Sequence, residues 1–284
     1  MHSPVNTLLV VGTGTMGAGI AQIAAAAGDT VLLFDGAPGV AARAKARIGA
    51  SMTRAAAKGH LDAASIPLTL ERLRPVEALS AAGPIDAAIE AVKEDLAVKQ
   101  GVFAELEAAF PPATLLWTNT SMISIARIAE KLRHPERVAG VHFFNPVPRM
   151  KLVEVIAGER TAPGTVDVAV QTVTRWGKTP VRAPDSPGFI VNRILDAIKR
   201  ESLALLDEGV PADQIDQGVR LGLNFPMGPF ELMDLIGLNN TLDAMKVQAE
   251  AVGRSTTFSP RIEKLVAQGH WGRKTGHGFY KYEK

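Results

Sequence analysis

The chain of 284 residues is long enough for two domains with a sizeable buried core. Its 31 Lys and Arg residues against 29 Asp and Glu residues give a formal net charge of +2, too little to indicate nucleic-acid binding. The absence of cysteine excludes disulfides and thiolate chemistry, and the six histidines show no metal-ligand spacing. No apolar run approaches the roughly 20 residues of a transmembrane helix, and the first strand-like run begins too early to leave room for a signal segment. We therefore expect a soluble, cytoplasmic protein with no nucleic-acid partner, membrane partner or metal.

The first half of the chain alternates short apolar runs with longer helical patterns, which is typical of a parallel α/β sheet. The expected strands cover 7–11, 30–35, 86–91, 114–118, 137–143 and 151–156. The last two are joined only by NPVPR, which is too short for a helical crossover, so we expect them to pair antiparallel.

Helical patterns replace the strands after the APDSPG segment at 183–188. A long amphipathic helix should close on Gly209, and further helices should begin near Pro211, Gly228, Leu238 and Ser259. The pattern predicts a Rossmann-type, doubly wound, mostly parallel α/β domain over 1–186 and an all-helical C-terminal domain over 187–284.

A glycine-rich segment, GTGTMG, follows the first expected strand directly. Gly12, Gly14 and Gly17 form G-x-G-x-x-G, which gives a tight turn, a close backbone approach to a pyrophosphate, and helix-on-strand packing. Such turns also occur for structural reasons alone. Asp35 favours a cofactor-binding turn over a purely structural one. A carboxylate at the end of the second strand can accept hydrogen bonds from ribose hydroxyls, and it repels a 2′-phosphate. The segment therefore predicts NAD as cofactor, bound also by the intervening Thr13, Thr15 and Met16.

One histidine and one glutamate lie twelve residues apart in HFFNPVPRMKLVE, on the last two expected strands. Alcohol oxidation needs a group that takes the hydroxyl proton, and histidine is the usual one. If the turn folds the second strand back, Glu154 can hydrogen-bond the far nitrogen of His142 and stabilise the protonated ring. From this pattern alone, a strand-end histidine with an exposed glutamate on an edge strand is the more common arrangement.

The chain resembles the 3-hydroxyacyl-CoA dehydrogenase family, which includes bacterial 3-hydroxybutyryl-CoA dehydrogenases, over essentially its whole length. The segments that carry the resemblance keep the family's order and spacing; they are GTGTMGAGIA, IEAVKEDLAVK, NTSM, HFFNPVPRMKLVEVI, DSPGFIVNRI, FPMGPFELMDLIGL and GRKTGHGFYKY. Several of them are long and specific. The length also fits the stand-alone enzyme of this family, without a fused hydratase domain.

The resemblance implies catalytic roles for four residues. His142 matches the general base and Glu154 its orienting partner, while Ser121 and Asn192 match positions that hydrogen-bond the substrate near its 3-oxygen. Asn192 lies beyond the expected domain boundary, which would place the site between the domains. In purely structural terms, Ser121 would cap a helix that starts near Ser124, and Asn192 would be an ordinary polar helix residue.

The same resemblance implies further ligand contacts. The family positions that contact NAD are matched by Glu94, Lys99, Ser121, Asn145 and Lys274, and those that contact coenzyme A by Ser51, Lys58 and Ser121. From Gly36 through Leu61 the chain has no acidic residue but carries five basic ones, which could meet the phosphates of an acyl-CoA. We add Arg54 to the coenzyme A contacts, because it lies one helical turn before Lys58. Such a basic run is more often only a solvated helix face.

Two positions depart from the family pattern. Met122 follows Ser121 where the family commonly has a second serine, and Arg149 stands in NPVPRM where an aliphatic residue is usual. Neither removes a catalytic group. Because Arg149 is close to the catalytic pair in sequence, it leaves the acyl preference open.

The resemblance implies an NAD-dependent dehydrogenase that oxidises (S)-3-hydroxyacyl-CoA to 3-oxoacyl-CoA, in fatty-acid β-oxidation or short-chain acyl-CoA metabolism, and a homodimer formed through the C-terminal domain. One alternative is a related Rossmann dehydrogenase of a free hydroxy acid or sugar acid. Another is a non-catalytic NADH-binding protein of the crystallin kind. Acyl-chain length and pathway are not encoded in any motif of the sequence.

Overall fold

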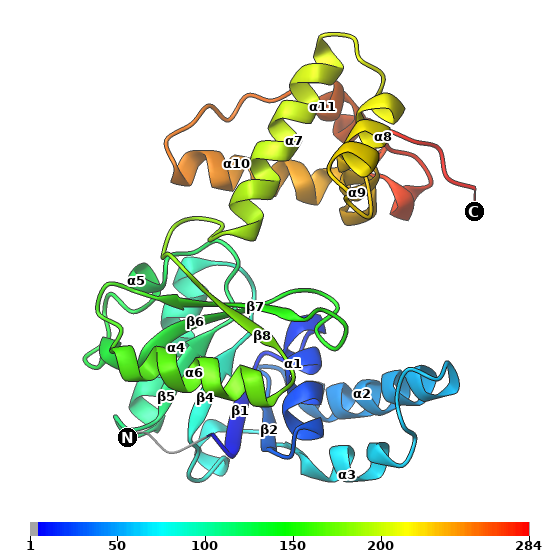
Figure 1. Cartoon of the computed structure of the whole chain (residues 1–284). Helices are drawn as coiled ribbons and strands as arrows, with labels where there is room; N and C mark the ends of the chain where they lie inside the picture. The colour runs from blue at the N-terminus through cyan, green and yellow to red at the C-terminus, as the bar shows by residue number, and fades with distance from the viewer. Residues whose placement is uncertain (1–4, 284) are drawn as a thin grey trace. The chain divides into compact units, whose positions relative to one another are not determined.

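A computed structural model describes residues 5–283 of the chain, which divide after Phe189 into two compact units (Figure 1). The first unit contains one eight-stranded sheet with the order β3-β2-β1-β4-β5-β6-β7-β8. Its strands are β1 Thr7–Val11, β2 Thr30–Phe34, β3 Leu73–Pro75, β4 Ala87–Glu90, β5 Leu115–Thr118, β6 Val138–Phe143, β7 Leu152–Ala157 and β8 Thr179–Ala183.

Helices cover both faces of this sheet, as in a doubly wound fold (Figure 1). They are α1 Thr15–Ala26, α2 Val40–Ala57, α3 Ser65–Arg72, α4 Leu96–Ala109, α5 Ile125–Ile128 and α6 Pro163–Arg175. All neighbouring strands pair parallel except β6 and β7, which pair antiparallel. The predicted Rossmann-type fold class and the predicted reversal after NPVPR are therefore confirmed.

Two strands escaped the sequence analysis because they lack a clear apolar pattern. β3 has only three residues and ends in Pro75. β8 is a mostly exposed edge strand with Pro180 in its second position, and both features weaken a strand pattern. β8 nevertheless matters for the site, because it pairs with β7 and removes β7 from the sheet edge.

Alternation along the strands decides which side chains meet. The apolar residues beside the two polar positions of β6 and β7 belong to a hydrophobic cluster with α1, α2 and α6, namely Val141, Phe143, Val153 and Val155. Because successive side chains of a strand point to opposite faces, His142 and Glu154 project from the other face. Glu90 and Thr118 project from that same face by the same rule, since Ile89 and Trp117 belong to the cluster.

The second unit consists of the predicted helices around their own core. They are α7 Val191–Asp207, α8 Ala212–Gly222, α9 Pro229–Ile236, α10 Leu238–Ala251 and α11 Pro260–Ala267, and each begins within a few residues of its expected start. Their buried core includes Leu203, Phe230, Met233 and Leu242. Within residues 5–283, no helix combines the length and the apolar character that membrane crossing requires.

Two buried carboxylates fasten the end of the chain to these helices. Asp234 accepts hydrogen bonds from the backbone N–H groups of Phe279 and Tyr280 and from the hydroxyl of Tyr282. Asp216 accepts one from the Tyr280 hydroxyl at 2.7 Å. Burial raises the pKa of Asp216, although its hydrogen bonds from the Tyr280 hydroxyl and from the backbone N–H groups of Phe230 and Glu231 oppose the shift. The GHGFYKY part of the family motif thus has a structural role in this chain.

Candidate active site

The glycine-rich segment connects β1 to α1, and its three glycines differ in how much space a side chain would have. Gly12 has a φ of +86°, and a Cβ there would lie 2.8 Å from the carbonyl oxygen of Ala91. A Cβ on Gly17 would lie 1.8 Å from the carbonyl oxygen of Gly12, whereas one on Gly14 would meet nothing within 4 Å. The outer glycines therefore serve packing, and the middle one leaves open space at the start of α1, where a pyrophosphate fits.

Asp35, directly after β2, holds this turn. Its Oδ2 accepts hydrogen bonds from the backbone N–H of Thr13 at 2.8 Å and from the Thr13 hydroxyl at 2.9 Å. Arg47 of α2 donates to the Thr13 carbonyl oxygen at 2.7 Å, a contact that the sequence analysis did not assign. Thr15 and Met16 lie in the first turn of α1. The open turn and the carboxylate beside it fit a dinucleotide cofactor.

His142 and Glu154 are register partners in the antiparallel β6–β7 pair. The Nδ1 of His142 lies 2.7 Å from Oε2 of Glu154. Because a carboxylate can only accept, Nδ1 carries the hydrogen and Nε2 presents its lone pair as a base. Both residues are buried, with exposed fractions of 4% for His142 and 0% for Glu154. The interpretation of Glu154 as an exposed carboxylate on an edge strand is therefore wrong.

Two aromatic rings flank the imidazole of His142. The ring centroid of Phe144 lies 4.6 Å from that of His142, and the centroid of Phe189 lies 5.6 Å away. Phe189 is only 1% exposed and has a φ of 48°, which is rare for a residue with a side chain. Phe189 could not be predicted as a site residue, because neither its backbone angle nor its packing on β6 follows from local pattern. The two rings restrict water around the base.

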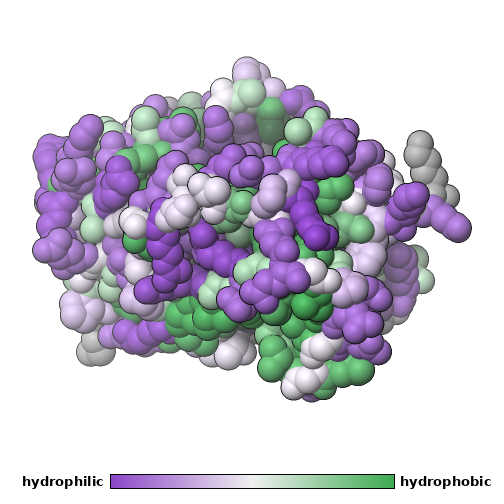
Figure 2. Space-filling model, turned by 90° about the horizontal axis from the view of Figure 1, so that it is seen from above, coloured by the Kyte–Doolittle hydropathy of each residue, from purple (hydrophilic) through white to green (hydrophobic). Residues whose placement is uncertain are grey.

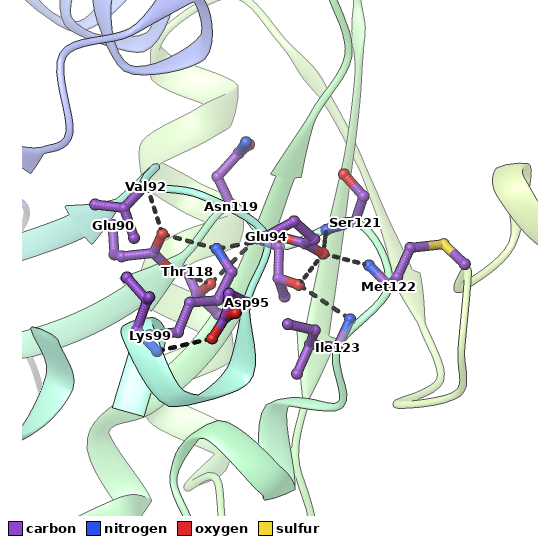
Figure 3. A network of polar contacts seen from close by, with 12 residues as sticks. Glu90, Val92, Glu94, Asp95, Lys99, Thr118, Asn119, Ser121, Met122 and Ile123 are labelled. Carbon is purple, nitrogen blue, oxygen red and sulfur yellow. Dashed lines mark hydrogen bonds and ion pairs between the residues drawn. The ribbon is translucent and has the colours of Figure 1, made fainter. Parts of the chain in front are cut away.

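A buried polar network lies at the ends of β4 and β5 (Figure 3). Lys99 of α4 is 1% exposed and forms ion pairs with Glu90 at 2.7 Å and with Glu94 at 3.2 Å. Glu90 also accepts a hydrogen bond from the Thr118 hydroxyl at 2.7 Å. Glu90 was not assigned by the sequence analysis; its only signal was a carboxylate at the end of an otherwise apolar strand.

Glu94 connects this network to the segment that follows β5. Its Oε1 accepts hydrogen bonds from the Thr120 hydroxyl at 2.6 Å and from the backbone N–H groups of Ser121 at 2.8 Å and Met122 at 2.9 Å (Figure 3). Partial burial by itself would raise the pKa of Glu94, but the Lys99 ammonium and these three donors outweigh it and lower the pKa. An ionised Glu94 therefore fixes the backbone at Ser121.

Ser121 does not cap the helix that follows it. The N-cap of α5 is Ser124, whose hydroxyl accepts from the backbone N–H of Arg127. Asp185 accepts from the N–H groups of Ile125 and Ala126, both at the start of α5. The structural alternative for Ser121 is thus removed, and its hydroxyl points away from Glu94 in Figure 3.

Three of the expected coenzyme A contacts, Ser51, Arg54 and Lys58, line two adjoining pockets of the first unit, whereas Ser121 lines neither. Ser51 and Arg54 of α2 line both pockets. The first pocket, of about 410 Å³, also contains Lys58. The second, of about 280 Å³, also contains Thr15 and Asn145. The structure thus brings expected cofactor contacts and expected coenzyme A contacts to neighbouring positions.

Two expected site residues belong to the second unit. Asn192 lies in the first turn of α7 and is half-buried. Lys274 donates from Nζ to Oδ1 of Asn239 at 2.6 Å and lies 5.0 Å from the ring centroid of Trp271.

Comparison with known proteins gives matches over nearly the whole chain. Residues 7–186 match the NAD-binding domain of 3-hydroxyacyl-CoA dehydrogenase, and residues 188–282 match the C-terminal domain of 3-hydroxyacyl-CoA dehydrogenase. The chain is 39% identical over 282 residues to a probable 3-hydroxybutyryl-CoA dehydrogenase of Bacillus subtilis, covering 99% of this chain and 98% of that protein. It is also 44% identical over 281 residues to the 3-hydroxyadipyl-CoA dehydrogenase of Escherichia coli K12, covering 98% of this chain but only 59% of that protein.

A solved structure agrees with these matches. An (S)-3-hydroxybutyryl-CoA dehydrogenase from Ralstonia eutropha superimposes with a TM-score of 0.93 at 35% sequence identity, covering 99% of this chain and all of that chain. The 3-hydroxybutyryl-CoA dehydrogenase of E. coli K12 gives a TM-score of 0.94 at 42% identity, and this chain covers 61% of it.

Proposed function

We propose that this chain, which belongs to the 3-hydroxyacyl-CoA dehydrogenase family, oxidises (S)-3-hydroxyacyl-CoA to 3-oxoacyl-CoA. His142 acts as the general base. The family assignment makes the chain an NAD-dependent oxidoreductase. The observation that carries the residue assignment is the buried 2.7 Å contact between His142 and Glu154. Neither a free hydroxy-acid dehydrogenase nor a non-catalytic NADH-binding protein is favoured by the relatives.

The His142–Glu154 pair accepts the proton that the substrate hydroxyl loses on oxidation. The Nε2 lone pair of His142 accepts the proton of the substrate 3-hydroxyl while the C3 hydride leaves, and NAD⁺, when bound, supplies the hydride acceptor. Glu154 holds the ring in the tautomer with a free Nε2 and stabilises the imidazolium that forms. In the reverse direction, the imidazolium returns the proton to the carbonyl oxygen.

Ser121 and Asn192 complete the proposed substrate contacts. A hydroxyl and a carboxamide can each donate to the oxygen that becomes a carbonyl. For Ser121 the support is the three hydrogen bonds with which Glu94 fixes the 120–122 backbone. For Asn192 the support is its match to the family motif.

The proposed NAD contacts follow the carboxyl ends of the parallel strands, where open α/β sheets bind ligands. The glycine turn after β1 receives the pyrophosphate, and Asp35 after β2 accepts from the adenine ribose. Glu94, Ser121 and Asn145 follow β4, β5 and β6 in turn. Lys99 acts through Glu94, because it is buried in ion pairs, and Lys274 is proposed only from its match to the family motif.

We expect Asp35→Ala to lower the preference for NADH over NADPH, chiefly by raising KM for NADH. The substitution removes an acceptor for the ribose hydroxyls and a charge that repels a 2′-phosphate. It also releases the two Thr13 hydrogen bonds, which both go to one oxygen of Asp35. Asp35→Asn, whose amide oxygen can accept both, is therefore the matched control for the shape of the turn. Steady-state kinetics with both cofactors measure the ratio. Unchanged selectivity in both variants would remove Asp35 from the cofactor site.

The activity is tested by reduction of acetoacetyl-CoA with NADH, followed at 340 nm, and then by a series of 3-oxoacyl-CoA esters of increasing chain length. We expect turnover of at least one CoA ester and none of free acetoacetate. A dicarboxylic ester belongs in the series, because the E. coli relative is named a 3-hydroxyadipyl-CoA dehydrogenase. Turnover of the free acid at the same rate, or of no CoA ester, would contradict the proposed function.

We also propose a metabolic role, a cellular location and an oligomeric state for this protein. Roles in fatty-acid β-oxidation or short-chain acyl-CoA metabolism, and a cytoplasmic location, fit an enzyme that uses NAD and CoA esters. A homodimer through the second unit is supported by exposed apolar side chains there, which include Leu221, Leu223, Leu235, Ile236 and Val247. Hydrophobic side chains gather in patches on the surface seen in Figure 2, and such patches mark association surfaces.

A further inference from the structure

The pocket of about 410 Å³ in the first unit has an unusual charge. Arg54 of α2, Lys58 directly after α2 and Arg149 of the β6–β7 turn line it, together with His60 and Ser51, and no carboxylate does. Within the described part of the chain, none of the ion pairs involves Arg54, Lys58 or Arg149. Three cations without a counter-charge around one concave site attract an anion, and clustered arginines suit phosphate in particular.

The turn that brings Arg149 to this pocket is held in place from beneath. Lys178 is 8% exposed, and its Nζ donates to the carbonyl oxygens of Val147 at 2.5 Å and Met150 at 2.8 Å, on either side of Arg149. The backbone N–H of Arg149 itself donates to the Pro146 carbonyl oxygen at 2.9 Å. The Arg149 backbone is therefore positioned before any ligand arrives.

A second pocket connects this one to the segment that follows the catalytic strand β6. The first pocket shares Gln22, Ser51, Arg54 and Pro148 with the second, whose lining includes Asn145, three residues beyond His142. The two pockets thus lead from the end of the catalytic strand to the three cations. A substrate with its reacting carbon at His142 and phosphates at its far end matches this layout.

We propose that Arg149 binds a phosphate of the CoA nucleotide, together with Arg54 and Lys58, and selects the CoA ester over the same acyl group on a shorter carrier. The inference rests on the proposed function. Arg149 then recognises the carrier end of the substrate, and the acyl preference lies with other residues.

The test compares Arg149→Met with Arg149→Lys, using acetoacetyl esters of CoA, dephospho-CoA and pantetheine. For Arg149→Met we expect KM for the CoA ester to rise about 5- to 30-fold, as for loss of a charge-assisted hydrogen bond, with kcat unchanged. KM for the pantetheine ester should stay within about twofold, and the effect on the CoA ester should shrink with added salt. Arg149→Lys should recover part of the loss. Lys151→Met, which removes an exposed charge from the same hairpin outside the pocket, should leave all three substrates unchanged.

The dephospho-CoA ester identifies the phosphate. A penalty that disappears with this ester assigns Arg149 to the 3′-phosphate, and one that persists assigns it to the diphosphate; both support the proposal. Equal changes for the CoA and pantetheine esters, or none, would overturn it. Thermal midpoint and NADH affinity report whether the variants are folded.

A binding experiment separates this inference from the proposed function. Calorimetric titration of CoA alone requires no turnover, and Arg149→Met should weaken the Kd by about the same factor as it raises KM. Weaker CoA binding in the variant would uphold the phosphate site even if the wild-type protein oxidised no 3-hydroxyacyl-CoA. Equal CoA affinity in the two proteins would overturn it even if the dehydrogenase activity were established.

Discussion

Glu154→Gln is expected to lower kcat for oxidation of a 3-hydroxyacyl-CoA by about 10- to 10⁴-fold. The amide keeps the size of the side chain but loses the charge that stabilises the imidazolium of His142. It can also present its NH₂ group to Nδ1, which would turn the ring to the wrong tautomer. Both effects act in the transition state, where the proton is in transit to Nε2.

Cofactor binding gives an independent control for this variant. Affinity for NADH should hardly change, because Glu154 is assigned no cofactor contact.

The measurement is kcat against pH for both proteins, with deuterium at C3 of the substrate to verify that hydride transfer limits the rate. Asp167→Asn is a matched control, since it removes an exposed carboxylate, with 54% of its side chain exposed, from the same unit. A Glu154→Gln protein with near-normal kcat would show that the carboxylate only fills space between β6 and β8.

Lys99→Met is expected to destabilise the first unit by about 3 to 5 kcal/mol, the usual cost of removing one partner of a buried ion pair. The substitution leaves Glu90, with an exposed fraction of 0%, without the ammonium at 2.7 Å. It also removes the cation that holds Glu94 and, through it, the backbone of Ser121. Activity should therefore fall together with stability.

Urea denaturation followed by circular dichroism measures the loss of stability. The double variant Lys99→Met/Glu90→Gln should recover part of it, because the uncompensated charge is then gone. Arg182→Met breaks an exposed ion pair, in which the side chains are 61% and 54% exposed, and should cost no more than about 1 kcal/mol. Equal stability of Lys99→Met and wild type would mean that the Glu90–Lys99 pair contributes nothing net to the fold.

Local pattern was sufficient for most of the first unit. Six strands, the glycine turn and the β6–β7 reversal follow from short-range periodicity and from the length of NPVPR, and the structure contains all of them. The pairing of His142 with Glu154 does not follow from pattern alone, because an exposed glutamate on an edge strand was the more common alternative. That alternative fails because β8 pairs with β7 and removes it from the sheet edge, and Glu154 is buried.

The features that could not be predicted depend on contacts between distant parts of the chain. Glu90 is a site residue only because Lys99 and Thr118 reach it from other elements. Asp185 caps α5 from about 60 residues away in sequence. Arg149 appeared in the sequence as a neighbour of the catalytic pair, whereas its pocket partners Arg54 and Lys58 lie at the C-terminal end of α2, about 90 residues earlier. Contacts between residues this far apart in the chain leave no periodic pattern in the sequence.

The central claim is that His142 transfers the proton in an NAD-dependent reaction of 3-hydroxyacyl-CoA. The most direct test is the rate of NADH oxidation with acetoacetyl-CoA for wild type and His142→Asn, with NADH binding measured on the same samples. We expect the variant to bind NADH within about twofold of wild type and to lose about 10²- to 10⁴-fold in kcat. A His142→Asn protein that reduces acetoacetyl-CoA at a rate near that of wild type would contradict the account.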